Sequence, residues 1–252
     1  MAPVSVLEIE IRDKRFPADD GAAGHLALKN LLLSVARGEL VCLLGPSGCG
    51  KTTLLNCIAG LDRDFAGTIA LPHAPDQPDP VIGYVFQEPR LLPWLSVRAN
   101  IELVLSEVQR GCGIVEDMLA ATGLEDFAEA YPQKLSLGME RRVALCRAFA
   151  VAPDILLMDE PFVSLDEPTA RRLRALLVAI WQQRPTTVVF VTHNLREAIE
   201  LADRIVVLSP APGTVRREIA VNLARGQRGD ERAIERFRQE LLDDQPEIFQ
   251  DL

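Results

Sequence analysis

The chain has 252 residues, enough to bury a substantial core in one or two domains. Hydrophobic residues make up 48% and charged residues 25%, which is ordinary for a globular protein, and the formal net charge is -9. A nucleic-acid backbone is normally bound by a basic face, so this charge and the lack of a Lys or Arg block argue against a nucleic-acid partner.

The first elements expected are strands. Residues 4–12 alternate apolar and charged side chains, which predicts a strand and gives no sign of a signal peptide. A Gly- and Asp-rich turn at 19–24 separates this strand from a second one around 31–36. The apolar run 40–44 has the length and the flanking glycines of a buried parallel strand.

A glycine-rich segment follows this apolar run and fits the pattern G-x-x-x-x-G-K-[ST] without a mismatch. Its residues are Gly45, Pro46, Ser47, Gly48, Cys49, Gly50, Lys51 and Thr52, and Thr53 completes the loop. The glycines let backbone N–H groups point at phosphate oxygens, and a helix beginning near Lys51 would add its positive N-terminal end. Lys51 can bridge the β- and γ-phosphates, and the hydroxyl of Thr52 can ligate Mg²⁺. The motif predicts an NTPase.

The middle and the end of the chain alternate between strands and helices. The prolines between residues 72 and 80 predict a loop, and residues 81–86 predict a strand. Helical character from Ser96 to Val151 leads us to interpret residues 88–150 as an inserted, mostly helical subdomain. The strands expected after it are 155–159, 187–192 and 205–208. This alternation implies a parallel sheet with helices on both faces.

The helix expected after Pro168 has the clearest periodicity. Its apolar side chains fall on one stripe, formed by Leu173, Leu176, Leu177, Ile180 and Trp181. Arg171, Arg172 and Arg174 lie off this stripe, so we expect them to form a solvated face.

Two acids, Asp159 and Glu160, end the apolar strand 155–159. Carboxylates buried beside apolar residues are unfavourable unless a cation or a hydrogen-bond donor compensates them. Mg²⁺ near Asp159 would do so, and Glu160 could polarise an attacking water as a general base. Alternatively, the strand end emerges into solvent, but the complete phosphate loop favours the catalytic interpretation.

The cysteines and the apolar runs argue against a cysteine-bound metal site and against a membrane-spanning segment. The five cysteines are scattered without a CxxC pair, so we expect reduced thiols and no cysteine-bound metal. The longest apolar runs are far shorter than the roughly 20 residues that cross a bilayer. A role at a membrane would therefore require another chain.

The segment 135–148, LSLGMERRVALCRA, lies just upstream of the Asp-Glu strand and resembles the signature sequence of ATP-binding-cassette ATPases. Further elements follow the order of that family: Phe16 for adenine, Gln87 of the Q-loop, Ser164-Leu165-Asp166 of the D-loop, and the switch residue His193. The resemblance covers roughly residues 4–221.

This resemblance implies an α/β fold. It implies a P-loop NTPase core, with a mixed sheet, flanking helices and an antiparallel β edge subdomain, plus an inserted helical subdomain. Residues 1–252 would form a single ATP-binding domain. In it, residues 88–150 would carry the signature and residues 222–252 a helical tail.

The resemblance also implies the roles of the site residues, with ATP and Mg²⁺ as cofactors. Two copies would face each other, and Ser136 and Gly138 would contact the γ-phosphate of the ATP held by the other copy. His193 would hold the γ-phosphate and the attacking water in line with Glu160. Thr52, Gln87 and Asp159 would bind or sense the metal. Phe16 would stack on adenine or, alternatively, pack in the core.

Short phrases narrow the resemblance to the nitrate/sulfonate/taurine group of bacterial importers. They are FQEPRLLPW at 86–94, Tyr131-Pro132, the SPAPG segment at 209–213 and a helical tail from Asp230. The partners implied are a second ATP-binding subunit, integral membrane permease subunits and, indirectly, a periplasmic solute-binding protein. The location implied is the cytoplasmic face of the inner membrane. Trp94 is expected where a permease helix docks, or else in the core.

Two residues depart from the family pattern, and other functions remain open. Leu137 replaces a glycine in the signature, and Asn194 stands where an acid commonly follows the switch histidine. An exporter, a lipid-moving complex or a poorly hydrolysing regulatory subunit are alternatives. A soluble cassette ATPase of DNA repair or translation is disfavoured, because the chain has no coiled-coil insertion, zinc cysteines or second cassette.

Overall fold

The computed structural model describes residues 5–17, 24–71, 79–184 and 186–250. The chain divides into two compact units. Unit 1 comprises residues 1–79 and 187–252, and unit 2 comprises residues 80–186. The predicted turn at 19–24 and the predicted loop at 72–80 fall mostly outside the described residues. Among the described residues, no helix is long and apolar enough to cross a membrane.

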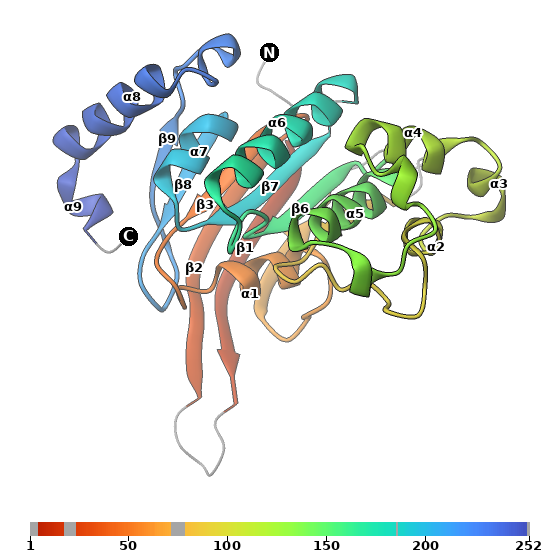
Figure 1. The fold of residues 1–252 in the computed structure, drawn as a ribbon. Helices are drawn as coiled ribbons and strands as arrows, with labels where there is room; N and C mark the ends of the chain where they lie inside the picture. Colours follow the sequence, from red (N-terminus) through yellow and green to blue (C-terminus); the bar gives the residue numbers. More distant parts are fainter. Residues whose placement is uncertain (1–4, 18–23, 72–78, 185, 251–252) are drawn as a thin grey trace. The chain divides into compact units, whose positions relative to one another are not determined.

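Unit 1 contains an antiparallel three-stranded sheet in the order β2-β1-β4 (Figure 1). Its strands are β1 (Ser5–Phe16), β2 (His25–Ala36) and β4 (Ala66–Ala70). The first two strands are longer than their alternation predicted, and β4 was not predicted. β4 pairs with β1 at Gly67, where a side chain would overlap the carbonyl oxygen of Glu10. Glycine is therefore required at this close approach.

A second layer of unit 1 holds the core strands in the order β7-β3-β8-β9. They are β3 (Leu40–Leu44), β7 (Thr187–Thr192), β8 (Arg204–Leu208) and β9 (Val215–Ala220). β3 and β7 have the predicted bounds, and every residue of both strands is buried. A parallel strand that is covered on both faces needs apolar side chains throughout, so its sequence is an apolar run that can be recognised. β9 is antiparallel to β8 and was not predicted.

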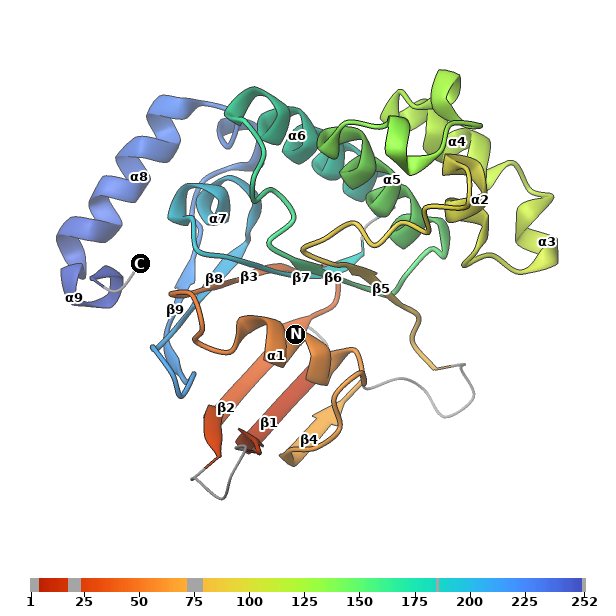
Figure 2. The ribbon, with the colours of Figure 1, turned by 60° about the horizontal axis from the view of Figure 1, so that its bottom comes forward.

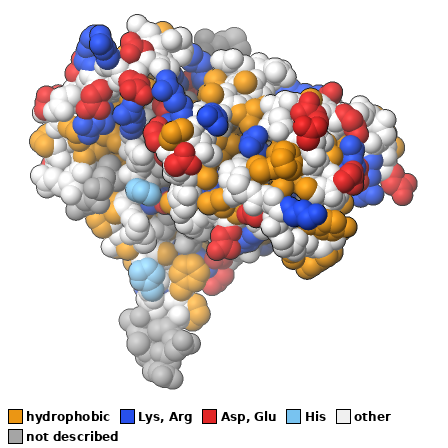
Figure 3. Space-filling model, viewed as in Figure 1, with side chains coloured by type: hydrophobic (Ala, Val, Ile, Leu, Met, Phe, Trp, Pro, Cys, Tyr) orange, Lys and Arg blue, Asp and Glu red, His pale blue; other side chains and the backbone are white. Residues whose placement is uncertain are grey.

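Helices lie on both faces of these core strands, as predicted. Figure 2 shows α1 (Lys51–Ile58) between the three-stranded sheet and the core strands, with α7 (Leu195–Leu201) on the opposite side. The tail forms α8 (Glu231–Asp244), which packs on α7, and the short helix α9 (Pro246–Phe249). Figure 3 shows acidic and basic side chains intermingled over α8, at the upper left.

Unit 2 pairs β5 (Ile82–Val85) with β6 (Ile155–Asp159) in parallel. The helices of unit 2 are α2 (Val97–Glu102), α3 (Glu107–Arg110), α4 (Ile114–Thr122), α5 (Leu137–Ala150) and α6 (Glu167–Gln183). Side chains from α2, α4 and α5 form one apolar core, which includes Ile101, Leu119 and Val143. This core explains why residues 88–150 read as helical.

The helical character expected from Ser96 to Val151 is divided among separate helices, with a break between α4 and α5. Gly123 ends α4 with a φ of 61°, a left-handed conformation that favours glycine. Between α4 and α5 the described chain forms only two three-residue 3₁₀ turns, Glu125–Phe127 and Pro132–Lys134. Gly123 and Pro132 therefore separate α4 from α5 within this mostly helical segment.

The expectation that Arg174 is solvated is also wrong. Its side chain is 3% exposed, lies over the ring of Phe162 at 5.8 Å, and donates to Glu167 at 2.6 Å. Arg171 and Arg172 are exposed, as expected. The apolar stem of an arginine and its planar head can both pack on an aromatic ring, so this arginine belongs to the buried face.

Candidate functional site

The glycine-rich loop connects β3 to α1, and its backbone depends on glycine at two positions. Gly48 has a φ of 79° and Gly50 a φ of 98°. A Cβ at Gly50 would also stand 2.6 Å from Cδ2 of Leu28 and 2.9 Å from the carbonyl oxygen of Ala27. Both the left-handed conformation and the lack of space exclude a side chain at residue 50.

Lys51 is held inside this loop by the backbone of the loop itself. Its Nζ donates to the carbonyl oxygens of Gly45 at 2.7 Å and Pro46 at 2.9 Å. The residue is 5% exposed, so its charge is satisfied mainly by these carbonyls. A phosphate oxygen would be a stronger, charge-assisted acceptor for the same amine.

The start of α1 favours an anion. Its first turn lies wholly within the described part of the chain and carries no acidic residue. Thr52 is exposed and Thr53 half-buried in this turn. The partial positive charge of the helix N-terminus therefore meets no carboxylate from its own first turn.

Neighbouring strands bring His193 to the same edge as the loop. Leu44, the last residue of β3, pairs with Thr192, the last residue of β7. Gly45 and His193 therefore leave adjacent parallel strands at their carboxyl ends, where α/β folds bind ligands. His193 is exposed.

Asn194, which departs from the family pattern, has a structural role at the start of α7. Its side-chain oxygen caps α7 by accepting from the N–H groups of Arg196 at 3.0 Å and Glu197 at 3.5 Å. The hydroxyl of Thr192 donates to Glu197 at 2.7 Å and accepts from the N–H of Asn194 at 3.1 Å. These bonds fix the turn that presents His193.

Phe16 ends β1 and is 39% exposed, so the expectation that it packs in the core is wrong. The ammonium of Lys14 stands 4.7 Å from the centre of its ring. Lys14 is held by Asp62 at 2.9 Å and by the carbonyl oxygen of Asp64 at 2.7 Å. Burial opposes its charge, but the hydrogen bond to Asp62 leads the interactions that raise the pKa of Lys14. The ring is therefore accessible and backed by a cation.

The acidic strand end lies in unit 2. Asp159 ends β6 and is buried, and Glu160 follows it half-buried with a φ of 42°. Burial raises the pKa of Tyr84 well above its usual range, and the charge of Asp159 adds to this rise. β5 runs parallel to β6, so exposed Gln87 lies beyond the same edge as the two acids.

The turn after Glu160 is held by Arg141, a contact that sequence reasoning missed. The N–H of Val163 donates to the carbonyl oxygen of Glu160 at 3.2 Å. The carbonyl oxygen of Val163 in turn accepts from Nη2 of Arg141 at 3.0 Å. Arg141 comes from α5, so the signature helix and the acidic strand end are linked within unit 2. Burial lowers the pKa of Arg141, an effect that Glu140 opposes.

The signature residues start α5. Ser136 is the N-cap, and its Oγ accepts from the N–H of Met139 at 3.3 Å, which leaves its O–H available as a donor. Leu137 is the first helical residue, and its side chain is 38% exposed. Leu137 has no positive φ, so it adopts the ordinary backbone of the first turn of a helix.

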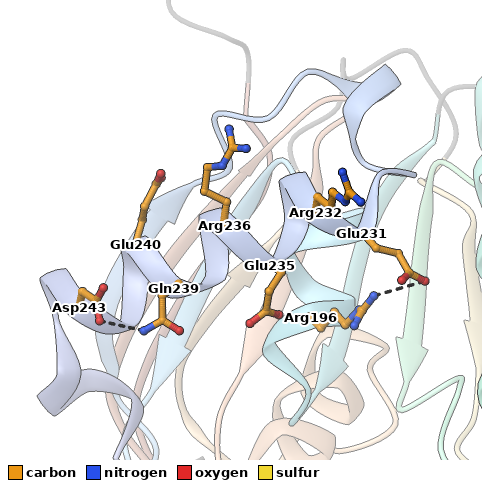
Figure 4. A pocket seen from close by; sticks show the side chains of 8 residues that line it. All are labelled: Arg196, Glu231, Arg232, Glu235, Arg236, Gln239, Glu240 and Asp243. Carbon is orange, nitrogen blue, oxygen red and sulfur yellow. Dashed lines mark hydrogen bonds and ion pairs between the residues drawn. The ribbon is translucent and has the colours of Figure 1, made fainter.

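The signature and the predicted D-loop share a pocket of about 580 Å³ in unit 2. The signature contributes Ser136 and Gly138 to its lining. The predicted D-loop contributes Ser164, Leu165 and Asp166. The resemblance supplied both motifs, and the structure brings them together. A second pocket, of about 780 Å³, lies along α8 in unit 1 (Figure 4). None of the predicted site residues lines it.

The candidate metal ligands are oxygen donors. Asp159 offers a carboxylate in unit 2, and Thr52 offers a hydroxyl in unit 1. Within the described ranges, no group of three or more His, Cys, Asp or Glu side chains could hold a metal ion. Hard oxygen ligands in small number suit Mg²⁺, which keeps several waters and binds substrate phosphates.

Comparisons with known proteins agree with these features. The profile of the ABC transporter family matches residues 28–163. Aliphatic sulfonates import ATP-binding protein SsuB 1 of Xanthomonas axonopodis pv. citri is 42% identical over 246 residues, covering 94% of this chain and 95% of the relative. Nitrate import ATP-binding protein NrtD of Synechocystis sp. is 42% identical over 224 residues, covering 86% of this chain and 83% of the relative.

Solved structures show the same likeness. The ATP-binding cassette MJ0796, in a dimeric post-hydrolysis state bound to ADP and Pi, has a TM-score of 0.74 at 32% identity. A further dimeric structure of MJ0796, described as a bacterial ABC transporter cassette, has a TM-score of 0.73 at 33% identity. Each covers 86% of this chain and 100% of its own. The predicted α/β fold class is confirmed.

Proposed function

Since this chain belongs to the ABC transporter family of ATP-binding cassettes, we propose that it is the motor subunit of a bacterial importer of aliphatic sulfonates, nitrate or similar small anions. The chain is an ATPase, and ATP is its cofactor. The observation that carries the proposal is the complete phosphate loop between β3 and α1, with Lys51 held by the loop carbonyls and no acidic residue in the first turn of α1. The names of the relatives support the solute class.

The residue roles belong to this proposal. Lys51 and the loop amides bind the phosphates, and Phe16 stacks on adenine from its exposed position at the end of β1. Glu160 takes a proton from the attacking water, and His193 holds the γ-phosphate. Thr52, Asp159 and Gln87 hold or sense Mg²⁺, which neutralises charge on the phosphates when it is bound.

The assembly is also proposed. Two copies close on two ATP molecules, and Ser136 and Gly138 of each copy contact the nucleotide of the other. The dimeric cassettes that resemble this chain support this arrangement. A membrane permease transmits the closure, a periplasmic protein delivers the solute, and the chain works at the cytoplasmic face of the inner membrane. Trp94 is 68% exposed in unit 2, which supports its proposed place where the permease docks and contradicts the alternative that it packs in the core.

Two experiments test the proposal. Purified chain with its permease should release phosphate from ATP only with Mg²⁺, and Lys51→Ala should lose ATP binding. Residual turnover equal to wild type in Lys51→Ala would overturn the assignment of the loop. Deletion of the gene should abolish growth on an aliphatic sulfonate as sole sulfur source or on nitrate as sole nitrogen source. Normal growth on both would overturn the solute class, and wild-type ATPase activity would then leave the motor role standing.

A further inference from the structure

The loop between β8 and β9, residues 209–214, leaves the core sheet at the same edge as the phosphate loop. Leu44 pairs with Val207, so Gly45 and Ser209 both follow the carboxyl ends of adjacent strands. Figure 1 shows this β8–β9 loop beside β2. Two backbone hydrogen bonds attach the loop to β2. The N–H of Gly213 donates to the carbonyl oxygen of Ala27 at 2.8 Å, and the N–H of Lys29 donates to the carbonyl oxygen of Gly213 at 3.1 Å.

Ser209 fixes the internal shape of the β8–β9 loop. Its hydroxyl oxygen lies 2.9 Å from the carbonyl oxygens of Pro210 and Pro212, and it accepts from the N–H of Thr214 at 3.0 Å. The N–H of Ser209 donates to the carbonyl oxygen of Thr214 at 2.9 Å. The loop is therefore closed on itself and presents Gly213 at a defined place.

Gly213 presses directly on the phosphate loop. A Cβ at this residue would overlap the carbonyl oxygen of Cys49 and would stand 3.1 Å from Cδ2 of Leu28. The start of the phosphate loop is equally crowded. A Cβ at Gly45 would stand 2.8 Å from Sγ of Cys49 and 3.3 Å from Cβ of Leu208. The two loops and β2 thus meet backbone to backbone, with no room for one methyl group.

We propose that the β8–β9 loop positions the phosphate loop for nucleotide binding, and that Gly213 is the positioning residue. This inference rests on the proposed role of the phosphate loop. The phosphate is bound by backbone N–H groups whose directions depend on each peptide plane of the loop. Displacing the Cys49 peptide would turn these donors away from the phosphate oxygens. A misplacement of about 1 Å is enough to lower the efficiency of a preorganised site by about 100-fold.

The test uses the full chain with three variants and a matched control. Gly213→Ala should raise the Kd for ATP by about tenfold or more, since it moves a phosphate-binding peptide. Ser209→Ala, which loosens the loop without touching Cys49, should raise the Kd less, and Ser209→Thr should restore it. Gly226→Ala is the control, because a Cβ there meets nothing within 4 Å. Its Kd should match wild type.

A purely structural role of Gly213 gives a different result. It would lower the unfolding temperature of Gly213→Ala and leave the Kd of the folded protein and the KM for ATP unchanged. The positioning role requires a raised KM with kcat at saturating ATP near wild type, measured with permease present. If Gly213→Ala does not fold, Ser209→Ala with a wild-type Kd overturns the inference. If Lys51→Ala also binds ATP normally, the proposed function fails instead.

Discussion

Replacing Gly138 by alanine sets a gain in helix stability against a steric clash. Gly138 is the second residue of α5, where alanine stabilises the helix over glycine by up to about 1 kcal/mol. A methyl group there would stand 2.8 Å from Cγ2 of Thr169 in α6. Overpacking of this kind costs roughly 1–3 kcal/mol, so the net destabilisation should be about 0–2 kcal/mol.

The same clash can be removed from the other side. Thr169→Ser deletes Cγ2 and keeps the hydroxyl, which bonds the carboxylate of Asp166 and thereby helps to lower the pKa of Asp166. In that background the methyl group at residue 138 has room, and Gly138→Ala should stabilise the protein by up to about 1 kcal/mol. The double-mutant cycle should therefore give a coupling energy of roughly 1–3 kcal/mol.

Unfolding followed by tryptophan fluorescence measures this cycle, because both tryptophans lie in unit 2. The indole N–H of Trp181 donates to the carbonyl oxygen of Thr186 at 2.6 Å in a buried site on α6. Equal destabilisation by Gly138→Ala in both backgrounds would refute the packing argument. ATP turnover of the double variant then separates fold from function. A stable but inactive double variant shows that the nucleotide of the second copy needs glycine.

Glu160→Gln should slow hydrolysis by roughly 10²–10⁴-fold and leave ATP affinity near wild type, as measured by phosphate release and ATP titration; unchanged turnover would remove Glu160 from its role. Leu137→Gly should lower the unfolding temperature, because glycine in the first turn costs up to about 1 kcal/mol. Its turnover with permease should rise if leucine crowds the second nucleotide, and a fall would contradict that. At pH 8, a thiol reagent should label exposed Cys112 before Cys146, since burial raises the pKa of Cys146 to about 12 and leaves little thiolate. Peptide mass spectrometry gives the order, and labelling of Cys146 first would contradict it.

The sequence predicted the buried strands better than the edge strands. β3, β6 and β7 have the expected bounds because each is an apolar run that both faces of a parallel ladder require. β4 and β9 have no fully buried side chain and no apolar run, so their hydrophobic pattern carries little signal. Their pairing depends on partners that are distant in the sequence, which a local pattern cannot show.

Arg174 shows where a signal was present but was misinterpreted. It lies three and seven residues before Leu177 and Trp181, the spacing of a shared helix face. Its charge suggested solvent, but its contact with Phe162 could be seen only in three dimensions. The close approach of Gly213 to Cys49 joins two loops that are remote in sequence. A single glycine in the sequence does not show which distant segment lies against it.

Glu160 holds a left-handed backbone with a φ of 42°, which costs a residue with a side chain roughly 1–2 kcal/mol relative to glycine. Its proposed role in hydrolysis would be the reason to keep a carboxylate there, since stability alone favours its loss. In a lineage that no longer needs to turn over ATP, mutation would carry this position toward glycine or asparagine. The residue found at position 160 in each descendant of this chain would then indicate whether that protein still hydrolyses ATP.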